Sequence, residues 1–208
     1  MAIRIALAGN PNCGKTTMFN ALTGANQYVG NWPGVTVEKK EGKLKSKKVK
    51  EEVVVTDLPG IYSLSPYTLE EVVSRNYLLK ENPDVIVDLV DATNIERNLY
   101  LTTQLIETGV PVVIALNMAD LLEKRGIKID VARLSMLLDC PIVETSALKG
   151  EGLDKLIDEA IKTAKKKEAD LPKEIFNKDL EDAVSAAAEV LPSSIDANKK
   201  RWYAVKFL

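Results

Sequence analysis

Histidine is absent from this chain of 208 residues, and cysteine occurs only twice. Histidine is the commonest general base and metal ligand in proteins, so any acid–base or metal chemistry here must use other groups. Cys13 and Cys140 are too few for a disulfide framework and are typical of a protein in a reducing cytosol.

Long apolar runs and an excess of positive charge are also missing. The longest apolar run, residues 110–116, is far shorter than the ~20 residues that span a bilayer, and the N-terminus lacks a signal-peptide pattern. With 28 basic and 30 acidic side chains, the net charge of −2 argues against a nucleic-acid partner. The composition, 46% hydrophobic, is that of a globular chain with a real core.

Short apolar strands alternate with helices along most of the chain. This alternation predicts an α/β fold with a mostly parallel sheet and helices on both faces. Strands 36–44 and 52–56 are expected to form an antiparallel pair, and residues 25–35 are expected to be loop. The other expected strands are 3–8, 85–90, 112–116 and 142–144, and the expected helices are 16–23, 70–80, 95–107, 130–138 and 153–165.

A charged, proline-ended linker at 165–172 divides the chain. We expect residues 1–167 to form the α/β domain and residues 171–208 to form a helical appendage, with helices at 177–190 and 192–208. The apolar, aromatic end at 202–208 indicates a fragment of a longer protein, because exposed patches of that kind normally need a partner surface.

The segment between the first strand and the first helix matches the pattern G-x-x-x-x-G-K-[ST]. Backbone N–H groups at the helix N-terminus would surround a phosphate, Lys15 would reach its β and γ oxygens, and the Thr16 hydroxyl would bind Mg²⁺. A plain strand–helix turn is the alternative, and the matching context disfavours it. The nucleotide-binding residues predicted here are Gly9, Asn10, Pro11, Asn12, Cys13, Gly14, Lys15, Thr16 and Thr17.

A second motif, Asp57-Leu58-Pro59-Gly60, ends the strand that follows this phosphate loop. Asp57 can hold the Mg²⁺ shell, and Gly60 can turn its N–H towards the γ-phosphate. Alone, the pattern is a common turn. Its position makes it specific, and it predicts that all four residues contact the nucleotide.

Two further motifs each follow a strand of the predicted sheet. The Asp120 carboxylate can accept the guanine N1–H and the exocyclic amine together, whereas adenine presents the wrong edge. A backbone N–H within residues 146–148 can meet the guanine O6. Each motif is weak alone, but in this order they predict a GTP-binding domain. The base-contacting residues predicted are Asn117, Met118, Asp120, Ser146, Ala147 and Leu148.

Taken together, these motifs resemble the Ras-like translation-factor class of P-loop GTPases. Residues 9–12, 30–40 with Gly42, and 57–64 more narrowly resemble the cytosolic N-terminal domain of the ferrous iron transport protein B family. The stretch Asn31-Trp32-Pro33-Gly34-Val35-Thr36 is the most specific part. The helical tail resembles that family's helical domain, which is implicated in holding GDP and so resembles a GDP-dissociation inhibitor.

The resemblance implies a GTP-hydrolysing switch that depends on Mg²⁺, is stimulated by K⁺, and lies at the cytoplasmic face of the cell membrane. Its ligands would be GTP and GDP, and its partner a ferrous iron permease that follows residue 208 in the parent chain. Homo-oligomers stay open. One alternative is a slow nucleotide sensor without essential turnover, and another is a ribosome- or tRNA-associated GTPase.

Ile61 stands where Ras-like enzymes have a water-orienting glutamine, so hydrolysis must rely on the metal, Lys15, backbone groups or a group supplied from outside the chain. The resemblance implies Asn12 as a K⁺ ligand, with the carbonyls of Gly30 and Trp32 completing the site. A loop-stabilising amide is the alternative role for Asn12. The predicted catalytic residues are Lys15, Asn12, Thr36 and Gly60.

Thr36 is expected to be the switch threonine, which binds Mg²⁺ only when the γ-phosphate is present, with Gly34 and Val35 before it in the nucleotide-contacting loop. The alternative is an ordinary threonine at a strand start. The predicted Mg²⁺ ligands are therefore Thr16, Thr36 and Asp57.

Two other positions carry open alternatives. Met118 replaces the usual lysine of the guanine motif, and it is either a base contact that weakens nucleotide binding or a core residue. Arg75 and Arg97 could act on the phosphates in cis, but solvated helix faces are the expected place for both. Trp32 is expected to be exposed in one state of its loop.

Overall fold

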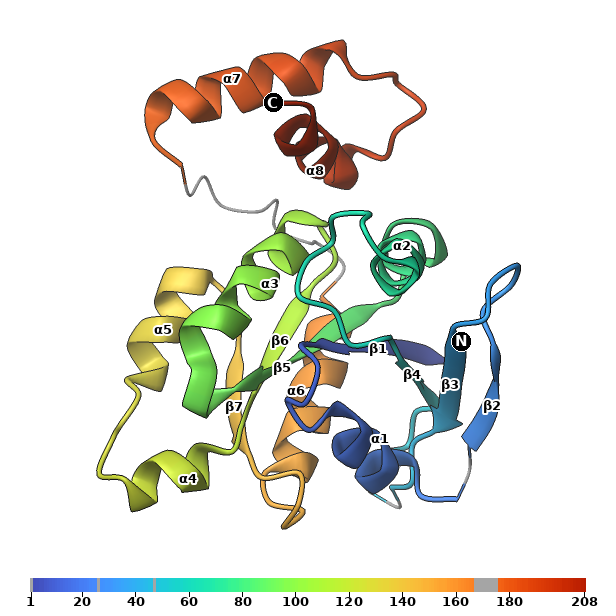
Figure 1. Ribbon diagram of the computed structural model, residues 1–208, viewed down its shortest axis with the longest axis vertical. Helices are drawn as coiled ribbons and strands as arrows, with labels where there is room; N and C mark the ends of the chain where they lie inside the picture. The colour runs from blue at the N-terminus through green and yellow to red at the C-terminus, as the bar shows by residue number, and fades with distance from the viewer. Residues whose placement is uncertain (1, 26, 47, 167–175) are drawn as a thin grey trace.

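The computed structural model describes residues 2–25, 27–46, 48–166 and 176–208 (Figure 1). A seven-stranded sheet forms its centre, in the order β2-β3-β4-β1-β5-β6-β7. Five neighbouring strands from β4 to β7 run parallel, and β3 is antiparallel to both β2 and β4. The strands are β1 Ile3–Gly9, β2 Gln27–Asn31, β3 Glu38–Lys43, β4 Val53–Asp57, β5 Val85–Asp91, β6 Val112–Asn117 and β7 Ile142–Thr145.

Helices cover both faces of the sheet, as the sequence predicts. Along β1, the side chains of Ile5 and Leu7 face the layer of α1 and α6, while Ala6 and Ala8 face the layer of α2, α3 and α5. The helices are α1 Lys15–Thr23, α2 Leu69–Asn76, α3 Ile95–Glu107, α4 Ala119–Lys124, α5 Val131–Leu138 and α6 Leu153–Ala164. No helix among the described residues is both long and apolar enough to cross a membrane.

Three elements differ from the prediction. Strand β2 occupies part of the expected loop 25–35; its side chains are largely exposed, so no alternation of apolar residues marks it, and pairing with β3 defines it. Helix α4 is short and was not expected. The expected helix 70–80 begins with a capping box between Thr68 and Glu71, but it changes at Tyr77 into a π-helical turn, η1 Tyr77–Glu81, here called the π turn.

The two C-terminal helices, α7 Lys178–Val190 and α8 Ala197–Phe207, form the appendage above α3 (Figure 1). They pack on each other through Val184, Ala187 and Ala204, a small apolar cluster separate from the two faces of the sheet. The expected domain boundary at 167–171 lies outside the described residues.

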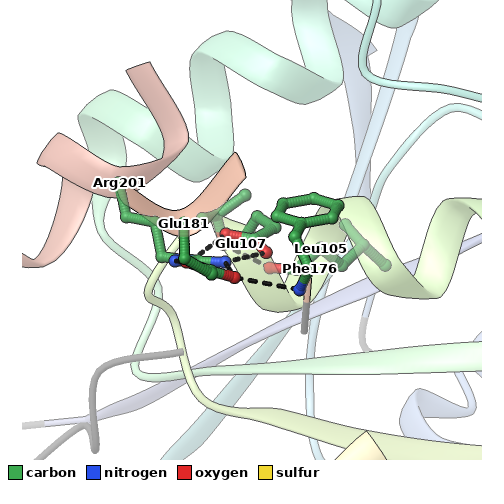
Figure 2. A network of polar contacts seen from close by, with 6 residues as sticks. Leu105, Glu107, Phe176, Glu181 and Arg201 are labelled. Carbon is green, nitrogen blue, oxygen red and sulfur yellow. Dashed lines mark hydrogen bonds and ion pairs between the residues drawn. The ribbon is translucent and has the colours of Figure 1, made fainter. Parts of the chain in front are cut away.

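Arg201 of α8 joins the appendage to α3 (Figure 2). Its Nε and Nη2 donate to Glu107 at 2.7 and 3.2 Å, and its Nη1 and Nη2 donate to Glu181 at 2.6 and 3.1 Å. The two carboxylates are almost fully buried, so the shared guanidinium compensates charges that the interior would otherwise disfavour.

A second joint connects α8 to the end of the π turn. Lys199 Nζ donates to the Leu79 carbonyl at 2.5 Å and to Asn82 Oδ1. Gly109, which follows α3 with φ of 75°, lies so close to Asn198 that a Cβ would come within 2.2 Å of its carbonyl oxygen. The appendage therefore contacts two elements of the α/β domain at once.

Candidate nucleotide-binding site

The phosphate loop, residues 9–16, leaves β1 and leads into the N-terminus of α1. Gly14 precedes the helix with φ of 93° and provides no side-chain cap, so the first N–H groups of α1 point into the loop. A Cβ on Gly14 would lie 2.5 Å from Asn117 Nδ2, and this close approach requires glycine. Gly14 thus lets the loop pass directly beside the Asn117 side chain.

Lys15 and Asp57 meet inside the loop. Lys15 Nζ lies 2.5 Å from Asp57 Oδ1, and only 10% and 6% of the two side chains are exposed. Burial raises the pKa of Asp57, and the Lys15 ammonium partly opposes this shift. The structure therefore brings two predicted site residues, 42 positions apart in the chain, into direct contact.

The turn after β4 lies against the phosphate loop. A Cβ on Gly60 would lie 3.2 Å from Pro11 Cα, and the Ile61 N–H donates to the Gly9 carbonyl at 3.3 Å. The Ile61 side chain is buried in the cluster beneath α2 and α3. No side chain at position 61 is therefore available to orient a water molecule.

The loop that carries Thr36 is folded back on itself. The Trp32 N–H donates to the Val37 carbonyl at 2.9 Å, and the Trp32 ring packs edge-on against Tyr77, with 5.3 Å between ring centroids. Trp32 is thus buried in this structure, and among the described residues its Nε1 has no hydrogen-bond partner. Thr36 is exposed and, within the described residues, makes no hydrogen bond to the phosphate loop, so its role as a Mg²⁺ ligand stays a prediction.

Asn12 is exposed at the outer rim of the phosphate loop. Its φ of 67° is a left-handed conformation that asparagine tolerates well. No hydrogen bond within the described part of the chain uses its carboxamide, which gives no support to a loop-stabilising role. The structure shows no contact between Asn12 and the carbonyls of Gly30 and Trp32, so the K⁺ site stays a prediction.

Asn117 ties the phosphate loop to the two base motifs. Its Nδ2 donates to the Cys13 carbonyl at 2.9 Å, and its Oδ1 accepts the Ala147 N–H at 3.0 Å. Thr145 Oγ1 lies 3.5 Å from the same oxygen. One buried side chain thus joins the phosphate loop to the end of β7 and to the loop that follows it, in a position that its motif predicts.

Met118 and Asp120 belong to the same base motif as Asn117. The Asp120 carboxylate pairs with Lys149 Nζ at 2.7 Å, and this contact lowers the pKa of Asp120. Met118 has φ of 63°, and its methyl group lies 3.7 Å from the position that a Cβ on Gly14 would take. Lys149 was not predicted; its place directly after Ser146-Ala147-Leu148 was the available signal.

An open cavity of about 380 Å³ borders the base motifs, of a size that suits a nucleobase-sized group. Polar and apolar side chains both line it. The lining residues are Leu116, Ala119, Asp120, Leu122, Ile127, Lys128, Ile129, Glu144, Thr145, Ser146 and Glu151.

The donor set suits Mg²⁺ held with phosphate rather than a metal cage. Thr16 and Asp57 supply a hydroxyl and one carboxylate at the loop, and Mg²⁺ is typically bound by one or two such groups plus substrate phosphates. Among the described residues, no group of three or more His, Cys, Asp or Glu side chains could hold a metal ion.

The family model described as "Ferrous iron transport protein B" matches residues 3–160. The Fe(2+) transporter FeoB of Shigella flexneri is 42% identical over 99% of this chain, and the Fe(2+) transport protein A/Fe(2+) transporter FeoB fusion protein of Porphyromonas gingivalis is 54% identical over 76% of it. The chain covers 27% and 19% of these two relatives, so it spans about a quarter of their length or less.

Solved structures give the same result. A mutant of S. thermophilus NFeoB bound to mGDP is 53% identical, with a TM-score of 0.93 over 99% of this chain and 78% of that one. NFeoB from S. thermophilus bound to GDP·AlF4⁻ and K⁺ is 54% identical, with a TM-score of 0.87 over 99% of this chain and 79% of that one.

Proposed function

Because the chain belongs to the ferrous iron transport protein B family, we propose that it binds and hydrolyses GTP as a switch that regulates ferrous iron transport. The observation that carries this proposal is the buried Lys15–Asp57 contact inside a loop that Asn117 ties to both base motifs. Motifs for phosphate and for base thus converge on one site.

Each loop residue has a distinct task in hydrolysis. Lys15 places its ammonium on the β and γ oxygens and stabilises the charge that develops there. Gly60, whose Cα lies close to Pro11, would donate its N–H to the γ-phosphate. Bound Mg²⁺ supplies charge neutralisation between the phosphates, and Thr16, Thr36 and Asp57 would hold it. Residues 9–17, 34–36 and 57–60 would contact the phosphates.

Asp120 selects guanine in this proposal, with the backbone of residues 146–148 on the base oxygen. We expect Asp120→Asn to shift preference from GTP towards XTP, because the amide reverses the hydrogen-bonding pattern at the base. Competition binding with GDP and XDP measures it. Asp182→Asn, the same change on the exposed side of α7, is the matched control, and an unchanged preference in Asp120→Asn refutes the assignment.

Potassium stimulation is the second part of the proposal. Asn12 with the carbonyls of Gly30 and Trp32 would hold K⁺ beside the phosphates, in the role that an arginine has in other GTPases, worth about 10³–10⁵ in rate. A K⁺ complex of the S. thermophilus relative supports this idea. Hydrolysis rates in K⁺ and in Na⁺ at equal ionic strength test it: equal rates, with no loss in Asn12→Ala, contradict the K⁺ site.

For the whole protein we propose a cytoplasmic-face location, where the domain of residues 1–167 acts on a permease domain of the same parent chain. The appendage, residues 171–208, would slow GDP release.

A slow nucleotide sensor is the second candidate function, favoured by the burial of Ile61. Single-turnover rates separate the two: turnover much slower than nucleotide release favours the sensor. A ribosomal role finds no support, since the relatives named above are Fe(2+) transporters.

A further inference from the structure

Arg97, on the first turn of α3, stacks on Tyr62. Its guanidinium carbon lies 4.1 Å from the centroid of the Tyr62 ring, well within the range of a cation–π contact. Tyr62 comes two residues after Gly60, on the loop that follows β4. The sequence predicts that Arg97 lies on a solvated helix face. In the structure its guanidinium instead lies over Tyr62, on the loop that follows Gly60.

A second contact lies two helical turns further along α3. The Leu64 N–H donates to Gln104 Oε1 at 2.8 Å. Arg97 and Gln104 are seven residues apart, so both side chains project from the same face of the helix. That face of α3 thus holds two points of the loop after β4, whose path beside α3 is visible in Figure 1.

The first turn of α3 also contacts the phosphate loop. The Asn10 side chain is 97% buried, since only 3% of it is exposed, and its Nδ2 lies 3.5 Å from the Arg97 carbonyl. Asn98, the next residue, accepts the Asp91 N–H through Oδ1 at 3.2 Å and donates to the Asn94 carbonyl at 2.9 Å. The backbone of Arg97 is thereby held beside the phosphate loop and the end of β5.

Arg97 therefore joins the phosphate loop to the loop that follows Gly60. Its backbone is held beside the phosphate loop, and its guanidinium holds the loop after Gly60. The Gly60 N–H donates to a γ-phosphate only if the two loops keep a fixed separation. The Ile61 side chain is buried in the core, but the hydrogen bond from its N–H to the Gly9 carbonyl, which joins the two loops, is long at 3.3 Å.

We propose that Arg97, supported by Gln104, is a positioning residue for GTP hydrolysis that holds the Gly60–Tyr62 backbone against the phosphate loop. This inference rests on the proposed GTPase function. The contact should matter for nucleotides with a γ-phosphate and not for GDP, because Gly60 meets only the γ-phosphate. A residue with a merely structural role would affect both nucleotides equally.

The test uses the whole chain with four variants. Arg97→Met keeps the side-chain stem and removes the charge. Tyr62→Leu removes the ring, whereas Tyr62→Phe keeps the ring and removes only the hydroxyl. Arg133→Met makes the same chemical change on exposed α5. We expect Arg97→Met and Tyr62→Leu each to lower kcat and the affinity for a non-hydrolysable GTP analogue about two- to fivefold, the range of an exposed cation–π contact. GDP affinity should be unchanged, Tyr62→Phe should rescue, and Arg133→Met should match the original chain.

A double variant completes the design. Arg97→Met with Tyr62→Leu should lose no more than either change alone, because both remove one contact. Full additivity, or an equal loss of GDP and GTP-analogue affinity, overturns the inference. If the unaltered chain hydrolyses GTP and Arg97→Met does so at the same rate, the positioning role is wrong and the GTPase function stands. If the unaltered chain shows no hydrolysis, the proposed function itself fails.

Discussion

Asp88 lies in the middle of β5 with its carboxyl group enclosed by the sheet and α3. Thr102 Oγ1 donates to its Oδ2 at 2.5 Å. Burial raises the pKa of Asp88 to about 7, and the hydrogen bond from Thr102 only partly opposes this shift. The folded chain therefore keeps a carboxylic acid protonated close to neutral pH.

Replacing this group should change how stability depends on pH. Below pH 4 Asp88 is protonated in both states; as the pH rises, the unfolded chain loses this proton first, and the free energy of unfolding falls until about pH 7. The total loss is up to about 4 kcal/mol. Asp88→Asn should remove it, so the variant gains on the original chain between pH 5 and pH 8. Urea denaturation at both pH values measures this.

A control separates this effect from an ordinary packing change. Any change in packing caused by the amide alters the free energy of unfolding equally at both pH values. The test therefore compares how this free energy changes between the two pH values. Asp158→Asn changes an exposed carboxylate on α6 and should show no such difference. A constant gap between Asp88→Asn and the original chain from pH 5 to pH 8 contradicts the assignment.

Asn117 has its own residue-scale prediction. Asn117→Ala leaves the Cys13 carbonyl and the Ala147 N–H without their partner, and two buried hydrogen bonds of this kind cost about 2–4 kcal/mol. We expect a lower urea midpoint and weaker GDP binding, since the phosphate and base loops then come apart. Asn20→Ala, on the exposed side of α1, is the control. Loss of stability with unchanged GDP affinity contradicts a role for the tie in binding.

Much of the site could be predicted from single residues because each motif is local. Gly14, Lys15 and Asp57 sit where strand–motif–helix logic places them. The contacts of Lys149, Arg97 and Tyr77 could not be found this way, because each partner lies far along the chain or outside the same motif. The sequence shows which groups carry charge or rings, and packing alone decides which of them meet.

At the scale of elements, the Thr36 loop and the π turn are joined by aromatic rings. Tyr77 is the first residue of the π turn; its ring meets Trp32, and its hydroxyl donates to Thr56 Oγ1 at 3.0 Å. Asn82, in a left-handed conformation, ends the turn. These contacts lie where the winding changes from α to π, in what the periodicity predicts as one continuous helix.

Removing the Tyr77 ring should free Trp32. In a Trp202→Phe background, which leaves Trp32 as the sole tryptophan, Tyr77→Leu should shift its fluorescence to the red and lower stability by about 1–3 kcal/mol, from the lost ring pair and the lost burial. Tyr77→Phe keeps the ring and should keep the blue-shifted emission. Identical spectra for the two variants contradict the contact.

Strongly periodic elements were the ones that could be predicted. Helix α3 has the predicted bounds, and β1 and β6 each extend one residue beyond theirs. Strand β2 was missed because pairing, not an apolar pattern, defines it, and α4 because six residues give too little periodicity.

At the scale of the whole molecule, the Arg201 guanidinium joins the appendage to α3 between two buried carboxylates. Arg201→Met leaves Glu107 and Glu181 buried without the guanidinium that they share, a change that typically costs about 3–5 kcal/mol. We expect faster amide hydrogen exchange in α7 and α8, while the central strands keep their protection. Lys206→Met, on the exposed side of α8, is the control. Uniform exchange changes across sheet and appendage contradict a local joint.

The π turn adds one residue to the chain between α2 and β5. A π turn holds one residue more than an α turn, so a one-residue deletion within it would restore plain α winding. Both kinds of turn complete one revolution, so everything beyond the deletion would keep its orientation around the helix axis. The Leu79 carbonyl and Asn82 would still face Lys199, and Tyr77 would keep its place. Relatives one residue shorter between Gly60 and Val85 should therefore retain the lysine bridge to α8.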